Sequence, residues 1–175
     1  MKTFFIAAAS LAALAVAAPA SAQMAPFSNV SVYGNLGWTD FSGSGTDLSA
    51  ITGRLGARFG QYVGVEGEVS GGIGNRDENG ASLHLNNAEA IYAVGFLPIL
   101  PNADLLARIG YGGNDYHVSV NGNNFGAHVD TVNYGVGGQY FFTHADGVRL
   151  DYTREDATDH GPDANLFGVS YVHKF

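Results

Sequence analysis

The sequence predicts an all-β fold: a membrane-spanning antiparallel up-and-down β-barrel of eight strands, preceded by a cleaved N-terminal signal peptide. Three observations support this prediction. Short segments alternate between apolar and polar residues with a period of two, long and short connections follow one another along the chain, and charged residues fall on the face opposite the aromatic ones. Together they favour strands with one face toward lipid and the other toward an enclosed lumen.

The N-terminus has the pattern of an export signal. An apolar, alanine-rich run covers residues 4–18 and is too short for a membrane span, which needs about 20 residues. Ala20 and Ala22 then form a small-x-small cleavage site. We expect cleavage between Ala22 and Gln23, so that residues 1–22 are a signal peptide. An uncleaved membrane anchor is the alternative.

The mature chain, residues 23–175, has the length of one domain. It contains no cysteine, which excludes a disulfide framework and a lipid anchor. The whole sequence has 16 acidic and 8 basic residues, a formal net charge of −8, and this balance argues against nucleic acid as a partner. Glycine is frequent, with 25 residues, and is interleaved with aromatic residues, a composition typical of β structure.

Eight segments carry the period-two alternation expected of strands. They lie at about residues 30–38, 50–59, 63–70, 83–96, 105–113, 129–142, 148–154 and 164–175. The alternation slips at Asn86–Asn87, where we expect a β-bulge. The long polar connections are residues 41–49, 71–81, 114–127 and 155–163, and short turns separate them. Long outer loops that alternate with short turns are typical of a membrane barrel.

The apolar face of each segment is expected to contact lipid. In the segment at 83–96 this interpretation turns Ala88, Ala90, Tyr92, Val94 and Phe96 outward. Tyrosine and tryptophan fit interfacial girdles at headgroup depth, and this set is Tyr33, Trp38, Tyr62, Tyr92, Tyr111, Tyr134, Tyr140, Tyr152 and Tyr171. Packing inside the lumen is the alternative for some of them, since Tyr33 falls on the polar face.

Charged residues on the opposite face would line the lumen. They are Arg54, Arg58, Glu66, Glu68, Glu89, Arg108, Arg149, Asp151 and Lys174. Buried charges persist only when they are paired, so we expect a network of ion pairs that plugs the barrel. A hairpin with Phe59 opposite Val63 would place Arg54 opposite Glu68 and Arg58 diagonal to Glu66. A row of solvated charges on a wet sheet face is the alternative.

The chain ends in an alternating aromatic run. Val169, Tyr171, His173 and Phe175 share one face, and Phe175 is the last residue. This ending resembles the C-terminal assembly signal of bacterial outer-membrane β-barrels, in which a terminal Phe follows an aromatic residue two positions earlier. His173 departs from that pattern, where Tyr is usual. An ordinary edge strand is the alternative.

Two further segments strengthen the resemblance. The hairpin at residues 147–152 and the run Arg108-Ile109-Gly110-Tyr111-Gly112 look like small OmpA-like, eight-stranded outer-membrane barrels, and the likeness covers nearly all of the mature chain. The resemblance implies residence in the outer membrane of a Gram-negative bacterium as a monomer. It also implies contact with outer-membrane lipids and lipopolysaccharide, and insertion by the outer-membrane barrel assembly machinery.

Motifs for catalysis and cofactor binding are not found. There is no nucleophile elbow, P-loop, HExxH or dinucleotide fingerprint, and we expect no catalytic residue, metal or cofactor. Residues near the outer loops leave one enzymatic alternative, a triad or metal site, and they are His117, His128, His160, Ser119 and Asp130. The acidic runs Asp77–Glu78 and Glu155–Asp159 would be solvated or hold divalent cations between lipopolysaccharide phosphates.

Three classes of function remain open. The sequence favours a barrel that is not an enzyme and has a structural or surface-interaction role, with its lumen plugged by salt bridges. A small passive diffusion pore is the first alternative, although eight strands enclose little more than their own side chains. A barrel enzyme that modifies lipid A is the second.

Overall fold

The computed structural model describes residues 29–43, 46–73, 76–78, 81–120, 123–158 and 163–175. The signal peptide and its cleavage site, with Ala20, Ala22 and Gln23, lie outside these residues. The strands are β1 (Val30–Gly43), β2 (Thr46–Phe59), β3 (Val63–Ile73), β4 (Arg76–Glu78), β5 (Ala81–Leu100), β6 (Ala103–Val120), β7 (Asn123–Phe141), β8 (Asp146–Ala157) and β9 (Ala164–Lys174). No helix among the described residues is long and apolar enough to cross a bilayer.

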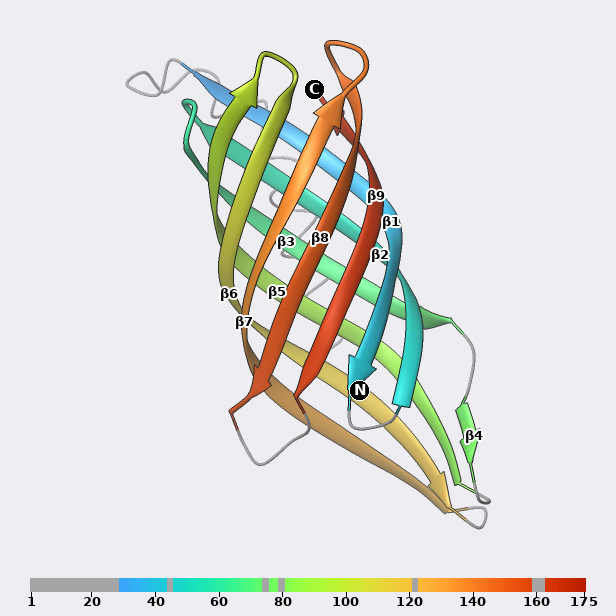
Figure 1. Ribbon diagram of the computed structural model, residues 1–175. Coiled ribbons are helices and arrows are strands. Elements are labelled where there is room, and N and C mark those ends of the chain that lie inside the picture. Colours follow the sequence, from blue (N-terminus) through green and yellow to red (C-terminus); the bar gives the residue numbers. More distant parts are fainter. Residues whose placement is uncertain (1–28, 44–45, 74–75, 79–80, 121–122, 159–162) are drawn as a thin grey trace.

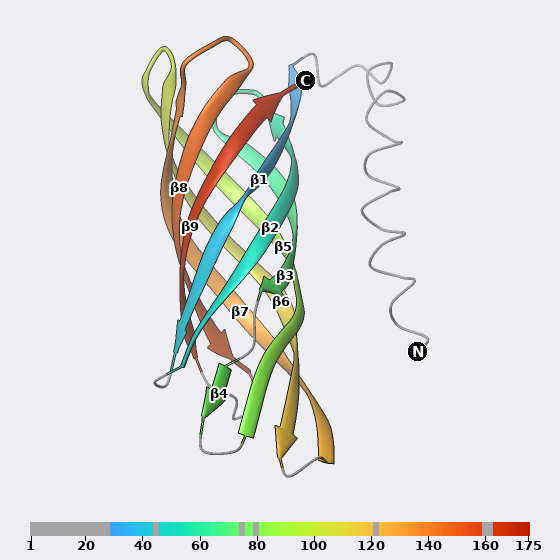
Figure 2. The same ribbon diagram turned by 90° about the vertical axis from the view of Figure 1, so that its right-hand side faces the viewer.

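The eight long strands form a closed antiparallel barrel with up-and-down connectivity, which confirms the predicted fold class. Neighbours in the chain pair with one another, β1 also pairs with β9, and β3 pairs with β5 to complete the ring. The short strand β4 adds only to the edge of β5. The strands are strongly tilted, and the C-terminus lies at the same end as the short turns after β5 and β7 (Figures 1 and 2).

A tight turn at this end sets the first predicted register. Gly60 has a φ of 69°, a conformation that side chains with a Cβ rarely adopt, and it lets β2 return directly as β3. Phe59 then pairs with Val63 and Arg54 with Glu68, as the sequence predicts. This register brings opposite charges together on the inner face of neighbouring strands.

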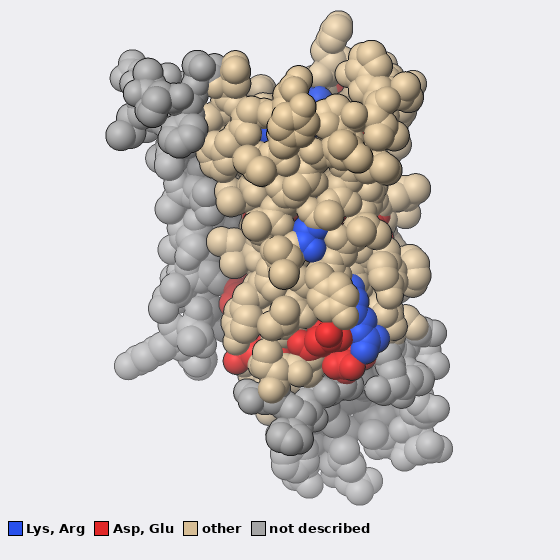
Figure 3. All heavy atoms as spheres, turned by 60° about the vertical axis from the view of Figure 1, so that its left-hand side comes forward, with Lys and Arg blue, Asp and Glu red and all other residues tan. Residues whose placement is uncertain are grey.

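The outer wall of the barrel is apolar between two aromatic bands. Near the loop end the exposed aromatic residues are Trp38, Tyr111, Tyr134, Tyr152 and Phe167, and near the turn end they are Tyr62, Tyr140, Phe142, Tyr171 and Phe175. We call these bands the loop-end girdle and the turn-end girdle, and the wall between them is the membrane-spanning part. Figure 3 shows acidic and basic side chains gathered near the loop end of one face, beyond a mostly uncharged wall.

Most of the predicted long loops are continuations of strands. Of the expected loop at residues 114–127, residues 114–120 belong to β6 and residues 123–127 belong to β7, and the two strands pair up to Val120 and Asn123. The strands are therefore longer than the 9 to 11 residues needed to cross a bilayer, with 20 residues in β5 and 19 in β7. The register shift between Leu85 and Asn87 confirms the β-bulge. Beyond it, β5, β6 and β7 extend past the rest of the barrel (Figure 1).

The predicted orientation of β5 is wrong. Tyr92, Val94 and Phe96 are buried in the lumen, whereas Ile91 and Glu89 are exposed on the outer face. The reason is that the lumen near the turns is itself apolar, so both faces of β5 carry apolar side chains there. A period-two pattern locates the two faces but cannot say which one meets lipid in that case. Tyr33 also faces the lumen and not a girdle.

Candidate functional site

The lumen is filled by side chains that lie in layers along the barrel axis. A first apolar cluster fills the turn end, and its buried members are Tyr33, Tyr92, Val94, Phe96, Leu106, Phe141 and Val172. A second apolar cluster fills the loop end, and its buried members are Phe41, Ala50, Leu85, Ala88, Ala164 and Leu166. Charged and polar residues occupy the space between them. The alternation of residues predicts the charges in the lumen, but it predicts neither apolar cluster.

The middle layer contains an ion pair that crosses the full width of the lumen. Arg149 on β8 binds Glu66 on β3, and both side chains have an exposed fraction of 0%. The second contact of this pair joins Arg149 Nη2 to Glu66 Oε2 at 3.1 Å. In the order of strands around the ring, β8 and β3 are four strands apart in either direction, so the two residues lie on opposite walls.

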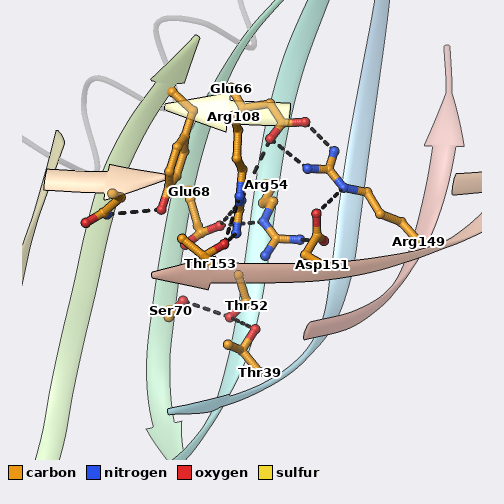
Figure 4. A network of polar contacts seen from close by, with 12 residues as sticks. Thr39, Thr52, Arg54, Glu66, Glu68, Ser70, Arg108, Arg149, Asp151 and Thr153 are labelled. Atoms are coloured by element: carbon orange, nitrogen blue, oxygen red, sulfur yellow. Dashed lines mark hydrogen bonds and ion pairs between the residues drawn. The ribbon is translucent and has the colours of Figure 1, made fainter. Parts of the chain in front are cut away.

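Two further arginines extend this pair into a network (Figure 4). Arg54 bridges Glu68 at 2.5 Å and Asp151 at 2.9 Å, and Arg149 Nε is 2.8 Å from the same aspartate. Arg108 Nη1 lies 2.9 Å from Glu68, and its Nε is 3.0 Å from Thr153 Oγ1. Three arginines thus face three carboxylates, and we call this set of six residues the central network.

The turn end of the network is tied to the first apolar cluster. The Tyr33 hydroxyl donates to Glu66 Oε1 at 2.7 Å, and the Arg108 guanidinium lies 4.4 Å from the centre of the Tyr92 ring. A Cβ at Gly56 would overlap the Tyr33 ring, so this ring packs directly on the β2 backbone. Aromatic rings therefore close one side of the central network.

Arg58 has a different partner from the one expected. It lies diagonal to Glu66 in the register, but it binds Asp104 on β6, with Nη1 3.0 Å from Oδ2. The Arg58 guanidinium also stacks 4.3 Å from the centre of the Phe96 ring. Lys174 Nζ lies 3.3 Å from the centre of the Phe141 ring at the same end of the barrel. These residues form a separate layer nearer the turns, in which Asp104 is buried.

Of the nine residues expected in the charged lumen, Glu89 is misplaced. The structure places Arg54, Arg58, Glu66, Glu68, Arg108, Arg149 and Asp151 on the inner wall. Glu89 is exposed on the outer face. It pairs with Gly113, which lies two residues past Tyr111 of the loop-end girdle toward the loops. A charge is tolerated there because the headgroup region, and not hydrocarbon, surrounds this level of the wall.

Sequence reasoning missed two buried acidic residues. Asp104 lies at the start of β6, one residue before the predicted strand at 105–113, and it accepts hydrogen bonds from Arg58 and from Gln139, the latter at 2.7 Å. Glu155 falls in the predicted acidic loop at 155–163, but it lies within β8 and has an exposed fraction of 3%. The signal that would have found it is the period-two continuation of Asp151 and Thr153.

The histidines of the outer strands do not form a triad among the described side chains. His128 Nδ1 lies 2.6 Å from Asp115 and its Nε2 lies 3.5 Å from Asp130. His160 lies outside the described residues, and only the backbone of His117 and Ser119 is described, paired with Gly126 and Asn124. Within the described part of the chain, no group of three His, Asp or Glu residues is arranged to hold a metal ion.

The acidic runs are divided between several environments. Asp156 is bound by Arg154 at 2.8 Å, and Thr158 donates to the Asp130 carbonyl at 3.1 Å. Asp159 lies outside the described residues, and the side chains of Asp77 and Glu78 are not described. Since Glu155 is buried, this run does not form one solvated cluster.

The C-terminal residues lie as an outward-facing row on β9. Val169, Tyr171 and Phe175 are exposed on the lipid side, and the Phe175 N–H donates to the Val32 carbonyl at 3.0 Å. The side chain of His173, which departs from the usual Tyr, has a binding partner. His173 Nδ1 lies 2.8 Å from Asp146, and the Tyr171 hydroxyl binds the same carboxylate.

Comparison with known families decides the identity of this barrel. The family model for the outer membrane protein beta-barrel domain matches residues 6–175. The chain belongs to this family. The protein is therefore a barrel of the Gram-negative outer membrane, and the predicted family resemblance and location are confirmed. A search of curated proteins found no match.

Solved structures with the same fold include three outer-membrane barrels. The attachment invasion locus protein Ail of Yersinia pestis, in complex with the heparin analogue sucrose octasulfate, has a TM-score of 0.62 and 14% identity over 83% of this chain and 97% of Ail. The N-terminal barrel of Pseudomonas aeruginosa OprF has a TM-score of 0.60 and 14% identity over 81% of this chain and 96% of the OprF barrel. Neisserial surface protein A has a TM-score of 0.57 and 12% identity over 83% of this chain and 97% of that protein. At these identities the likeness shows the fold alone.

Proposed function

We propose that this protein is a non-catalytic barrel with a structural or surface-interaction role, whose lumen is plugged by the central network. The observation that carries the proposal is the pair of Arg149 and Glu66, which spans the lumen between opposite walls with no exposed side-chain surface. A water-filled path would have to pass this pair. It would also have to pass an apolar cluster at each end of the lumen.

The test is single-channel conductance of the refolded mature protein in a planar bilayer. Heat-modifiable migration on a gel first establishes that the protein is folded. We expect a folded and electrically silent barrel, because the guanidinium and carboxylate groups fill the lumen. Reproducible conductance steps that disappear on denaturation would contradict the proposal and favour the diffusion pore.

A lipid-modifying enzyme is the other alternative, and the test for it is separate. Among the histidines near the outer loops, His128 has a described side chain, and it contacts two carboxylates, but no described hydroxyl is hydrogen-bonded to it as a nucleophile. Mass spectrometry of lipid A from cells with and without the protein should show the same species. A modification that disappears in a His128→Ala variant would contradict the non-catalytic assignment.

The surface-interaction part of the proposal concerns the loop end. The extension of β5, β6 and β7 projects past the loop-end girdle, and exposed acidic side chains are frequent near this end. A sulfated sugar such as the one bound by Ail does not suit this charge. We expect lipopolysaccharide contacts here through divalent cations, and removal of these cations should weaken lipopolysaccharide retention on purified protein.

The remaining parts of the proposal concern export and assembly. We propose that the chain is cleaved between Ala22 and Gln23, that the barrel assembly machinery inserts it through its C-terminal strand, and that it resides in the membrane as a monomer. Intact mass of the protein purified from outer membranes tests the cleavage site. We expect the mass of a chain that begins at Gln23. The mass of a chain that retains residues before Gln23 would contradict cleavage at this site.

A further inference from the structure

Glu155 is a buried carboxylate whose hydrogen bonds come from neutral groups. Its exposed fraction is 3%, and it lies on the inner wall of β8. Asn114 Nδ2 on β6 donates to Glu155 Oε2 at 2.8 Å, and Asn133 Nδ2 on β7 lies 3.4 Å from Oε1. Neither amide carries a charge that could offset an ionised carboxylate.

The other buried carboxylates of the described lumen each have an arginine. Glu66, Glu68 and Asp151 face the three arginines of the central network, and Asp104 binds Arg58. These four arginines and four carboxylates balance, and the remaining cation of the inner wall, Lys174, lies against Phe141 at the other end of β9 from Glu155. Within the described part of the chain, Glu155 is the buried carboxylate that forms no ion pair.

The groups around Glu155 on every neighbouring element leave it without a cation. From β6, Arg108 attracts it, but this guanidinium donates to Thr153 and Glu68. From β3, Glu68 repels it. The hydroxyls of Tyr92 on β5 and Tyr116 on β6 are neutral. The neighbours on β7 and β9 are Asn133 and Ala164, to which it is paired. On its own strand, Arg154 binds Asp156 on the outer face.

Glu155 lies outside the membrane-spanning part of β8. It is three residues past Tyr152 of the loop-end girdle, and its chain neighbours Arg154 and Asp156 are charged on the outer face. Burial without a counter-charge disfavours the ionised form of a carboxyl group. Burial raises the pKa of Glu155 to about 7, the Asn114 hydrogen bond opposes this rise, and the Glu68 charge adds to it.

We propose that Glu155 is a proton-binding site of the lumen, which the folded barrel holds as a neutral carboxylic acid between Asn114 and Asn133. In the folding reaction one proton moves from solvent to a Glu155 carboxylate oxygen, and no other bond changes. The three arginines and three carboxylates of the central network then remain balanced in charge. This inference goes beyond the structural or surface-interaction role and does not depend on it.

The sign of the pH dependence follows from the raised pKa. In the unfolded chain a glutamate titrates near pH 4.3, so below this pH both states carry the proton and the contribution of Glu155 to stability is fully present. Between about pH 4.3 and the folded-state pKa of about 7, only the folded state holds the proton. Stability then falls as pH rises, by up to about tenfold in the unfolding equilibrium constant per pH unit.

The test compares urea unfolding of the wild-type protein and the Glu155→Gln variant in phospholipid vesicles at pH 4.5 and pH 8. Glutamine mimics the neutral acid, so we expect equal unfolding constants at the lower pH. At the higher pH we expect the variant to unfold less readily, by about two orders of magnitude in the unfolding constant. Parallel pH profiles, or a variant that is less stable at pH 8, would overturn the proposal.

The matched control is Glu68→Gln, because Glu68 is the nearby buried glutamate that does form ion pairs. Glu68 is ion-paired with Arg54 and Arg108, so its neutral variant should be less stable than wild type at both pH values. If Glu155→Gln behaved like this control, Glu155 would be ionised. An infrared measurement on the wild type is independent of variant folding. It should show a protonated-carboxyl band at pH 5 that is lost at pH 9, and its absence at pH 5 would contradict the site.

Discussion

Arg149 and Glu66 are 83 residues apart in the chain and bind each other across the full width of the barrel. Each side chain is completely buried, and each has a second partner. Arg149 also binds Asp151, and Glu66 also accepts a hydrogen bond from Tyr33. The pair therefore links β8 to β3 through the lumen in addition to the ladder that joins neighbouring strands.

The first prediction concerns this arginine. Arg149→Met would leave Glu66 and Asp151 without their shared cation, and we expect a loss of about 3–5 kcal/mol in the free energy of unfolding. Arg154→Met is the matched control on the same strand, because Arg154 forms its ion pairs at the half-exposed loop end. We expect it to lose less than about 1 kcal/mol. Urea unfolding in vesicles measures both, and equal losses would contradict the prediction.

The second prediction concerns the contact between Tyr33 and the β2 backbone. A methyl group at Gly56 would overlap the Tyr33 ring, so Gly56→Ala should displace the ring and weaken its hydrogen bond to Glu66. We expect a loss of about 1–3 kcal/mol in the free energy of unfolding. Gly67→Ala is the control, because a Cβ at Gly67 would meet no atom within 4 Å. A wild-type unfolding midpoint for Gly56→Ala would show that the ring packs elsewhere.

The fold was predictable because the barrel repeats one local rule. Alternation, turn spacing and the Phe59–Val63 hairpin register follow from the pleat of the strands, and the structure confirms them. The facing of β5 was not predictable in the same way, because Tyr92, Val94 and Phe96 are apolar residues in an apolar part of the lumen. The sequence pattern there is the same whether these residues contact lipid or each other.

The partners within the lumen were predictable only between neighbouring strands. The pairing of Arg54 with Glu68 follows from one hairpin. The contacts of Arg149 with Glu66 and of Arg58 with Asp104 cross the lumen, and they depend on the closure and tilt of the whole ring. No local pattern encodes such distances.

The third prediction concerns pH at the loop-end extension. The hydrogen bond to Asp115, with smaller contributions from the charges of Asp115 and Asp130, raises the pKa of His128 above its usual value. A raised pKa means that the contact of protonated His128 stabilises the folded hairpin fully below about pH 6.5. This contribution is lost as pH rises through the folded-state pKa.

Nuclear magnetic resonance titration of the His128 ring measures this shift. We expect Asp115→Asn to lower the pKa of His128 toward its ordinary value, and Asp130→Asn to lower it less, because the distances to His128 are 2.6 Å and 3.5 Å. Asp163→Asn is the control, since Asp163 binds Arg154. A pKa of His128 that is the same in all three variants would show that the pair with Asp115 does not form.

The fourth prediction concerns the C-terminal strand. Phe175 is 78% exposed and faces lipid, and the proposed assembly signal requires its ring. Phe175→Ala should reduce the amount of heat-modifiable barrel in outer membranes several-fold. Lys174→Ala is the control on the opposite face of the same strand, where Lys174 contacts Phe141. If both variants assembled equally well, the terminal aromatic ring would have no special role in assembly.

The central claim is that charges close the lumen from opposite walls, and a double-mutant cycle of Arg149→Met and Glu66→Gln tests it most directly. The free energies of unfolding of wild type, the two single variants and the double variant are measured in the same vesicles. We predict that the double variant loses less free energy of unfolding than the two single variants lose together. The difference, the coupling energy, should be about 1–3 kcal/mol. Losses that add within about 0.5 kcal/mol would contradict a direct Arg149–Glu66 pair across the lumen.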